Sequence, residues 1–285
     1  MFTSLHSSST ARGSVITIIQ SLPIRNCLLY ICSAELISNN LKSKTYILLP
    51  RNTCFHGSPD LPSYQTFNYK LNLMPEAISE LVRQLIHSFK PQDCDSMKSL
   101  VDSMPIITCA GKNKVGKVAT EITSKGYCST KNMYYFGLKL HAVAFRRKGT
   151  IPFPKMLILS ATDENDSTVF KREYVGNLNN REIYADKIYS DIPFYKETKE
   201  YKKLELFTPV KAIKGESPEI TKREKAARDL FSTAVSKVRQ PIEALFNWLN
   251  EKTNIQRAMK VRSTSGLLVH TMGKIAIALI TLIFN

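Results

Sequence analysis

The clearest pattern of hydrophobic and polar positions lies at residues 75–89, where apolar side chains recur every three or four residues. They are Ile78, Leu81, Val82, Leu85, Ile86 and Phe89. This spacing predicts an amphipathic helix that lies on a core. Pro75 fits the first turn of that helix, and Pro91 stops it. Two earlier stretches, 14–22 and 26–37, are apolar enough for short helices or strands.

After residue 95 the pattern changes to that of strands, with β-branched, aromatic and alternating residues. Strands are predicted at 99–108, 133–145, 154–161, 182–185 and 204–210. In the second of these, the alternation puts Lys139 and His141 on one side. Helical patterns return at 221–238, 242–251 and 266–283. Strands followed by helices predict an α/β (α+β) fold in which helices pack on a mixed sheet.

The chain is strongly basic. It carries 40 Lys and Arg against 24 Asp and Glu, a formal charge of +16 over 285 residues. The excess is uneven, with net +3 in residues 1–100 and net +13 in residues 101–285. The hydrophobic content of 43% is enough for an ordinary packed core and excludes a disordered chain. The charge points to nucleic acid, ahead of an anionic membrane surface, lying mainly against the second part.

Several protein classes are disfavoured by what the sequence lacks. The six cysteines form no CxxC pair and have no histidines at finger spacing, so we expect reduced thiols, a cytosolic protein and no zinc site. The first twelve residues do not have the pattern of a signal peptide. His270 and Lys274 interrupt the most apolar stretch, 266–284, so a buried helix is expected there rather than a membrane anchor. Without a P-loop or a Gly-rich dinucleotide fingerprint, no nucleotide cofactor is expected.

Three acidic residues stand among apolar ones. Asp102 interrupts a predicted strand, Asp186 follows another, and Glu243 falls in the first turn of a predicted helix. A buried carboxylate costs several kcal/mol unless a cation or a proton neutralises it. Carboxylate oxygens are the ligands that Mg²⁺ prefers, and a pair of such ions can drive phosphoryl transfer. Ordinary turn capping or a favourable interaction with a helix dipole would also explain each acid singly.

Several short stretches between about residues 60 and 285 resemble the sequences of a known protein family. The matching stretches are Val-Asp-Ser-Met-Pro at 101–105, Lys-Gly-Tyr-Cys-Ser-Thr-Lys at 125–131, Tyr-Tyr-Phe-Gly-Leu-Lys-Leu-His at 134–141, Tyr-Ala-Asp-Lys-Ile-Tyr at 184–189 and Arg-Gln-Pro-Ile-Glu at 239–243, with a lead-in at 61–67. Together these resemble bacterial insertion-sequence transposases of the DDE class, whose catalytic domain has a ribonuclease-H-like fold.

The resemblance implies a metal-binding triad of Asp102, Asp186 and Glu243, which lie 84 and 57 residues apart. Asp102 would lie on the first, central strand, Asp186 at the end of the fourth, and Glu243 on a helix beside the sheet. Two Mg²⁺ or Mn²⁺ ions would support cleavage at the end of the mobile element and attack of the freed 3′-hydroxyl on target DNA. Residues 1–95 would form a helical N-terminal region that helps to grip the element's ends, and 96–285 the catalytic domain.

The resemblance also implies partners and a location. Double-stranded DNA, as element end and as target, would be the substrate, and a homodimer or larger synaptic complex would hold two ends together. No membrane partner is expected, and the protein would be cytoplasmic and associated with the bacterial nucleoid. Within the family, an Arg four residues before the Glu can contact a phosphate, which here is Arg239.

This sequence departs from the family at several positions. Ile188 stands where the family usually has Gly, Ser236 replaces a Tyr, and Asn250 replaces a Lys that Lys252 could substitute. Pro241 fits a helix start but would disturb a continuous helix. These departures motivate a rival hypothesis, a decayed transposase that binds DNA without catalysis. A nuclease that cuts without strand transfer is a third possibility.

Other charged residues complete the candidates. Asp163 and Asp166 also follow a predicted strand and are the alternatives to Asp186. Basic residues that could contact DNA phosphates are Lys112, Lys114, Lys117, Lys139, Arg146, Arg147, Lys148, Lys187 and Arg239. Phosphate contacts of this kind would make binding fall steeply with salt. Solvated surface charge is the alternative explanation for each lysine singly.

Overall fold

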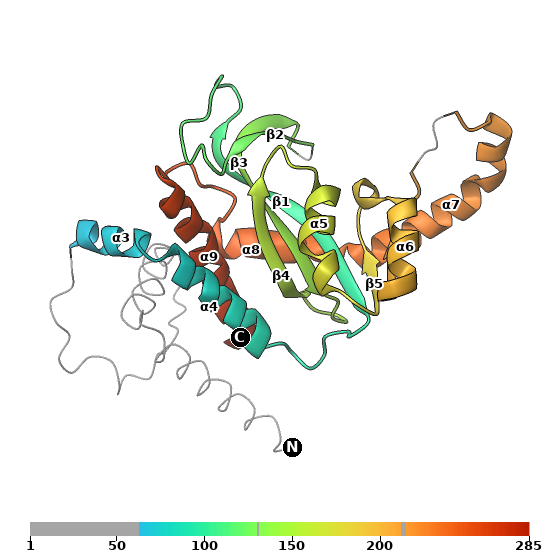
Figure 1. Ribbon diagram of the computed structural model, residues 1–285, viewed down its shortest axis with the longest axis horizontal. Coiled ribbons are helices and arrows are strands. Elements are labelled where there is room, and N and C mark those ends of the chain that lie inside the picture. The colour runs from blue at the N-terminus through green and yellow to red at the C-terminus, as the bar shows by residue number, and fades with distance from the viewer. Residues whose placement is uncertain (1–62, 130, 212–214, 285) are drawn as a thin grey trace, which may run out of the picture.

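A computed structural model describes residues 63–129, 131–211 and 215–284 (Figure 1). The stretches at 14–22 and 26–37 lie outside these residues. The helices are α3 (Tyr64–Asn72), α4 (Pro75–Ser88), α5 (Asp166–Glu173), α6 (Ile192–Lys202), α7 (Pro218–Arg239), α8 (Pro241–Thr253) and α9 (Thr264–Phe284). The strands are β1 (Lys98–Ala110), β2 (Ser124–Cys128), β3 (Met133–Phe145), β4 (Phe153–Ala161), β5 (Arg181–Tyr184) and β6 (Leu204–Phe207). Two short 3₁₀ turns are η1 (Val175–Asn177) and η2 (Lys187–Tyr189).

One mixed sheet forms the centre of the fold, as the sequence pattern predicts. Its order is β2-β3-β1-β5-β6, and β4 also pairs with β3, next to β2. The pairings β1–β3, β2–β3 and β3–β4 are antiparallel, whereas β1–β5 and β5–β6 are parallel. The long strand β1 therefore lies inside the sheet, between an antiparallel and a parallel neighbour.

Helices cover both faces of the sheet, so β1 is buried on both sides. Successive strand side chains point to opposite faces. Leu100 and Met104 share a core with α4, α8 and α9, whereas Val101 packs with α5, η2 and α6. A strand covered on both faces can carry a polar side chain only where that side chain finds a partner.

Helix α4 braces the sheet. Its apolar stripe, which includes Leu81, Val82 and Leu85, belongs to the same core as β1, α8 and α9. Figure 1 shows α4 and α9 side by side along one flank of the sheet. The described part of the predicted N-terminal region, residues 63–95, thus ends in a helix that shares its core with the predicted catalytic domain.

The termini of several elements differ from the sequence prediction. Strand β6 ends at Phe207, before Pro209, which has no N–H for a ladder hydrogen bond. Four elements were not predicted: α3, β2, α5 and α6. They are short or strongly charged, and only two residues of α6 are buried. As the helix-start preference of proline suggests, α7 ends at Arg239 and α8 begins at Pro241.

Helix α9 is apolar over most of its length. Among the residues that the structure describes, it is the one helix long and apolar enough to cross a membrane, with 44% of that window buried. Its buried side includes Leu267, Ile275 and Leu279, which join the core under the sheet. The packing agrees with the prediction of a buried C-terminal helix.

Gly137 provides a test of the β1–β3 pairing. A β-carbon at this position would lie 1.9 Å from the carbonyl oxygen of Ile106, close to where the register of the two strands shifts. We expect Gly137→Ala to lower the free energy of unfolding by about 3 kcal/mol or more, because backbone must move to admit the methyl group. Urea unfolding, followed by the fluorescence of the single Trp248, measures the effect.

Gly176→Ala is the matched control, because no atom lies within 4 Å of a β-carbon there. We expect a change of less than about 1 kcal/mol for this variant. Equal losses for the two glycines would contradict the close approach of β3 to β1.

Candidate active site

Asp102 lies on β1, and Asp186 lies just past the end of β5, the parallel neighbour of β1. Leu100 on β1 pairs with Tyr184, the last residue of β5. Asp102 follows Leu100 by two residues, and Asp186 follows Tyr184 by two residues. Because the two strands run in the same direction, both carboxylates come to the same level of the sheet. Asp186 then caps the turn η2, where its carboxylate accepts a hydrogen bond from the backbone N–H of Lys187 at 2.8 Å.

The junction of α7 and α8 brings a cation and a third carboxylate to Asp102. Arg239 ends α7 and Glu243 lies in the first turn of α8, four residues later. Residues four apart share one side of a helix. The guanidinium of Arg239 donates from Nη1 to Asp102 at 2.7 Å and from Nη2 to Glu243 at 2.6 Å. Arg239 therefore bridges a strand acid and a helix acid that are 141 residues apart.

The Asp102 carboxyl group is electrostatically strained. Burial is the main reason that its pKa is raised from 3.8 to about 6. The Ser103 N–H and the Arg239 guanidinium oppose this shift, whereas the negative charges of Asp186 and Glu243 add to it. The other two predicted triad members, Asp186 and Glu243, are thus close enough to Asp102 for their charges to raise its pKa.

Ile188 fits its position without strain. It lies in the 3₁₀ turn η2, is 45% exposed, and does not have a positive φ angle. The replacement of the family's Gly by Ile188 predicts a strained or reshaped turn at this position. The structure has a 3₁₀ turn here, which an L-residue adopts readily.

The three carboxylates are of a chemical type that binds Mg²⁺, but they are not arranged as a complete metal-binding site. Oxygen donors from Asp and Glu are the usual protein ligands of this ion. Within 63–129, 131–211 and 215–284, however, no group of three or more His, Cys, Asp or Glu is placed to hold a metal ion. Arg239 lies between Asp102 and Glu243, so its guanidinium would have to leave before a cation could bridge them.

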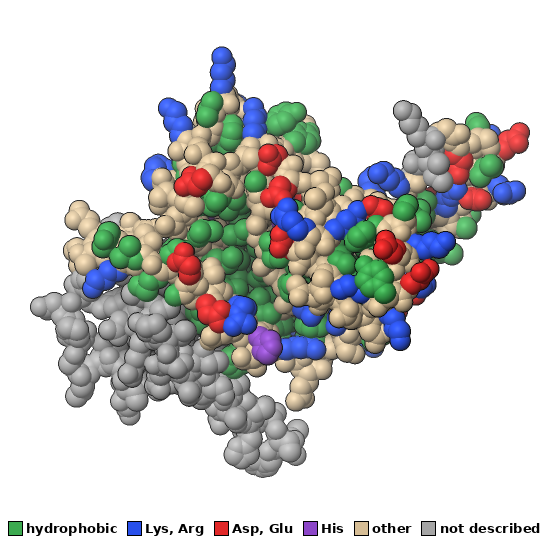
Figure 2. All heavy atoms as spheres, in the orientation of Figure 1, with side chains coloured by type: hydrophobic (Ala, Val, Ile, Leu, Met, Phe, Trp, Pro, Cys, Tyr) green, Lys and Arg blue, Asp and Glu red, His purple; other side chains and the backbone are tan. Residues whose placement is uncertain are grey.

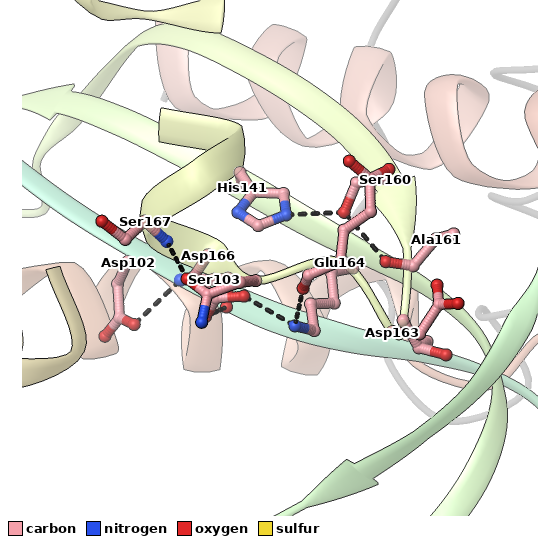
Figure 3. Close-up of polar contacts among 12 residues, drawn as sticks. Asp102, Ser103, His141, Ser160, Ala161, Asp163, Glu164, Asp166 and Ser167 are labelled. Atoms are coloured by element: carbon pink, nitrogen blue, oxygen red, sulfur yellow. Dashed lines mark hydrogen bonds and ion pairs between the residues drawn. The ribbon is translucent and has the colours of Figure 1, made fainter. Parts of the chain in front are cut away.

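A second polar cluster lies on the other face of β1. Because Ser103 is next to Asp102, its side chain points to the opposite side. Its hydroxyl donates to Asp166 at 2.8 Å, and Lys139 Nζ contacts the same carboxylate at 2.7 Å and the carbonyl oxygen of Glu164 at 2.7 Å (Figure 3). The Lys139 and Asp166 side chains are only 18% and 14% exposed. Figure 3 shows Asp163 away from Asp102, and its side chain is exposed.

Asp166 is the residue whose role the sequence analysis missed. Asp166 begins α5, directly after the Asn165 cap. Its carboxylate forms an ion pair with Lys139, the one charged side chain in the middle of β3. The available signal was Lys139 itself, since a lysine among buried strand residues requires an acidic partner. Lys139 therefore forms an ion pair inside the protein and is not available to contact a DNA phosphate.

Two further polar groups near this cluster are neutral. His141 Nε2 lies 2.8 Å from the Ser160 hydroxyl, and burial lowers the pKa of the imidazole to about 4. The Tyr189 hydroxyl is buried without a hydrogen-bond partner in the described part of the chain, and burial raises its pKa well above the ordinary value. The electrostatic fields of Asp166, Asp102 and Asp186 all reach this hydroxyl.

The predicted DNA-contacting lysines and arginines do not form one surface. Lys112, Lys114 and Lys117 are exposed in the loop after β1, whereas Arg146, Arg147 and Lys148 form the β3–β4 turn next to the start of β1. A 13-residue strand separates the groups by roughly 40 Å if it is fully extended. Arg147 is also engaged, since its Nε lies 2.9 Å from both Asp93 oxygens. Of the predicted set, Lys187 and Arg239 adjoin the carboxylates.

The raised pKa of Asp102 predicts a pH-dependent stability. Between about pH 4 and 6 the folded protein keeps a proton that the unfolded chain has lost, so the free energy of unfolding falls as the pH rises through this window. We expect Asp102→Asn to reduce this fall by up to about 3 kcal/mol. Urea titrations of both proteins between pH 4 and 7, with EDTA present, measure it. Parallel curves for the two proteins would contradict the assignment.

The Lys139–Asp166 pair predicts a strong coupling. Asp166→Ala should cost about 3–5 kcal/mol, because it leaves a buried ammonium without its partner. The double variant Lys139→Met, Asp166→Ala should be more stable than Asp166→Ala alone. The exposed pair Lys199–Glu205 is the control, where Glu205→Ala should cost less than about 1 kcal/mol. Additive losses at 139 and 166 would rule out the coupling.

Comparisons with protein-family models, with curated proteins and with solved structures found no match for this chain. The functional argument therefore depends on the residues themselves. Their arrangement consists of two strand acids and a helix acid around Arg239 on one face of β1, and an ion pair between Lys139 and Asp166 on the other.

Proposed function

We propose that this protein is a DDE-class DNA transposase, which cleaves phosphodiester bonds at the ends of an insertion sequence and transfers the strands into target DNA. The catalytic domain would have a ribonuclease-H-like fold. One observation carries the proposal: Arg239 hydrogen-bonds to both Asp102 and Glu243, and the parallel pairing of β1 with β5 brings Asp186 to the same end of the sheet. The three acids come from a central strand, the end of its parallel neighbour and a helix beside the sheet.

The topology supports the assignment of these positions. Asp102 lies on the first strand, which is central in the sheet. Asp186 follows β5, which becomes the fourth strand when the short, unpredicted β2 is set aside. Glu243 lies on α8, which packs against β1. These are the places that the sequence resemblance implies for the three acids.

Each residue then has a role in the proposed reaction. Asp102, Asp186 and Glu243 would hold Mg²⁺ or Mn²⁺, which would activate the attacking oxygen and stabilise the leaving one. Arg239 neutralises Asp102 and Glu243 in the metal-free protein. A bound cation would take over that neutralisation, and the guanidinium would then be available for a DNA phosphate, which it can grip through two N–H groups. Lys187, exposed beside Asp186, would contact a second phosphate.

A non-catalytic DNA-binding protein is the second candidate. The observation in its favour is that Arg239 occupies the space between Asp102 and Glu243 with two short hydrogen bonds. A protein that has lost its metal site could keep this ion-paired arrangement and its basic surface. The two candidates differ in whether a divalent cation displaces the guanidinium.

Nicking of a supercoiled plasmid in Mn²⁺ or Mg²⁺ tests catalysis without knowledge of the element's ends. We expect metal-dependent nicking by the wild type and at least about a 100-fold loss in Asp102→Asn, Asp186→Asn and Glu243→Gln, because removal of a metal ligand weakens the site. Asp163→Asn is the matched control and should retain activity, since this exposed acid lies away from Asp102. A joining assay with pre-cut ends then separates a transposase from a nuclease.

The outcomes discriminate between the candidates. Tight DNA binding without cleavage in either metal would favour the non-catalytic protein. Calorimetric titration with Mn²⁺ would then show no saturable site that depends on Asp186. Cleavage that survives Asp186→Asn but not Asp163→Asn would mean that Asp163 supplies the second carboxylate.

A further inference from the structure

Three cationic side chains from three separate elements converge on the ring of Phe145. Lys90, just after α4, has its Nζ 4.2 Å from the ring centroid, and Lys155 on β4 has its Nζ at 5.5 Å. The guanidinium carbon of Arg181, at the start of β5, lies at 5.1 Å. Phe145 itself is 7% exposed and ends β3. A cation over an aromatic face is stabilised, but three cations around one ring also repel one another.

These three charges have no carboxylate partner within 4.0 Å in the part of the chain that the structure describes. Arg181 donates instead to the hydroxyl of Ser99 at 2.7 Å. Burial and the neighbouring charges of Arg181 and Lys90 lower the pKa of Lys155, and burial lowers that of Arg181. By contrast, Arg83 and Arg147 nearby each have an acidic partner. Asp95 acts on Arg181 from beyond ion-pair distance, so the cluster is a local excess of positive charge rather than a set of ion pairs.

The cluster is open to a ligand. Lys90, Lys155 and Phe145 line a hollow of about 530 Å³ between α4 and β4, and Arg83 and His87 lie on the same hollow. Figure 2 shows a hollow with hydrophobic side chains in its floor and basic side chains at its lower border. The ammonium groups of Lys90 and Lys155 at its wall can thus reach an anion that enters from solvent, and Arg181 contacts the same Phe145 ring from beyond the lining.

We propose that Lys90, Lys155 and Arg181 form a binding site for the phosphodiester backbone of DNA. The inference rests on the proposed function, since DNA is its ligand, and it adds a contact outside the carboxylate region. A phosphate would replace the missing counter-charge and accept hydrogen bonds from several donors at once. Asp93 neutralises Arg147 in the turn that follows Phe145, but Lys148 in the same turn is exposed and adds positive charge that a polyanion could contact.

The position of the cluster fits a role in holding the substrate. Phe145 pairs with Ser99 on β1, three residues before Asp102, which corresponds to about 10 Å along the strand. Arg181 begins the strand that leads to Asp186. The Ser99 side chain, like that of Ser103, faces the side of β1 opposite to Asp102, so DNA bound to the cluster would be held at the far face of the sheet, away from the reacting atoms.

Binding of a fluorescein-labelled 30-base-pair duplex, measured by anisotropy from 50 to 300 mM salt, tests the proposal. We expect the triple variant K90Q/K155Q/R181Q to bind about 10- to 100-fold more weakly at 100 mM salt and to have a salt slope shallower by about 3, because each of the three lost phosphate contacts removes the release of about one counterion. The control variant R172Q/K199Q/R223Q loses the same charge from exposed residues that have acidic partners. It should bind almost as the wild type does.

Melting temperatures, measured with and without DNA, distinguish a loss of DNA binding from a loss of folding. The double variant K90Q/K155Q leaves the Arg181–Ser99 hydrogen bond in place, and relief of like-charge repulsion should keep its melting temperature at or above that of the wild type. Duplex DNA should raise the melting temperature of the wild type more than that of the double variant, since a ligand stabilises the state it binds.

The possible results of the binding experiments distinguish failure of the proposed site from failure of the proposed function. Equal affinities and slopes for the triple variant and the control would overturn the site and leave the proposed function standing. Failure of the wild type to bind DNA would overturn both. Acidic phospholipids offer the same phosphate chemistry, so vesicles of phosphatidylglycerol and phosphatidylcholine form a second arm. Loss of vesicle binding in the triple variant, with unchanged DNA binding, would assign the cluster to a membrane surface instead.

Discussion

Burial of strand β1 on both faces is the constraint on which the polar architecture depends. Its apolar side chains join two separate cores, one against α4, α8 and α9 and the other against α5, η2 and α6. Every polar side chain on this strand must then be neutralised or hydrogen-bonded, because water reaches it poorly. Asp102 meets this requirement through Arg239 and the N–H of Ser103, and the Ser103 hydroxyl meets it through Asp166.

The two polar clusters differ in charge balance. On one face Lys139 and Asp166 compensate each other almost completely inside a closed environment. On the other face Asp102 and Glu243 share one guanidinium, and burial together with the charges of Asp186 and Glu243 raises the pKa of Asp102. Surplus negative charge of this kind is costly for stability but is what a cation-dependent reaction requires. Strand β1 thus carries on adjacent residues Ser103, which contacts the structural ion pair, and Asp102, a candidate catalytic group.

The positive charge of the chain is also divided into compensated and uncompensated parts. Arg83, Arg147, Arg172 and Arg228 form ion pairs with nearby acids and contribute to local structure. The cations around Phe145 have no such partners among the described residues, and burial, together with repulsion from Arg181 and Lys90, lowers the pKa of Lys155. Net charge alone cannot separate these groups, because it counts paired and unpaired side chains equally.

The sequence by itself determined the mixed sheet, most of its strands, the helix at Pro75, the break at Pro241 and the positions of three acids at strand and helix termini. These features follow from local periodicity and from the backbone limits of proline. Only the tertiary structure decided that Lys139 pairs with Asp166, that Arg239 bridges Asp102 and Glu243, and that Lys90, Lys155 and Arg181 meet at one ring. Apart from Arg239–Glu243, which are four residues apart, these contacts join residues 10 to 137 positions apart, and their formation depends on how strands and helices pack rather than on any local pattern.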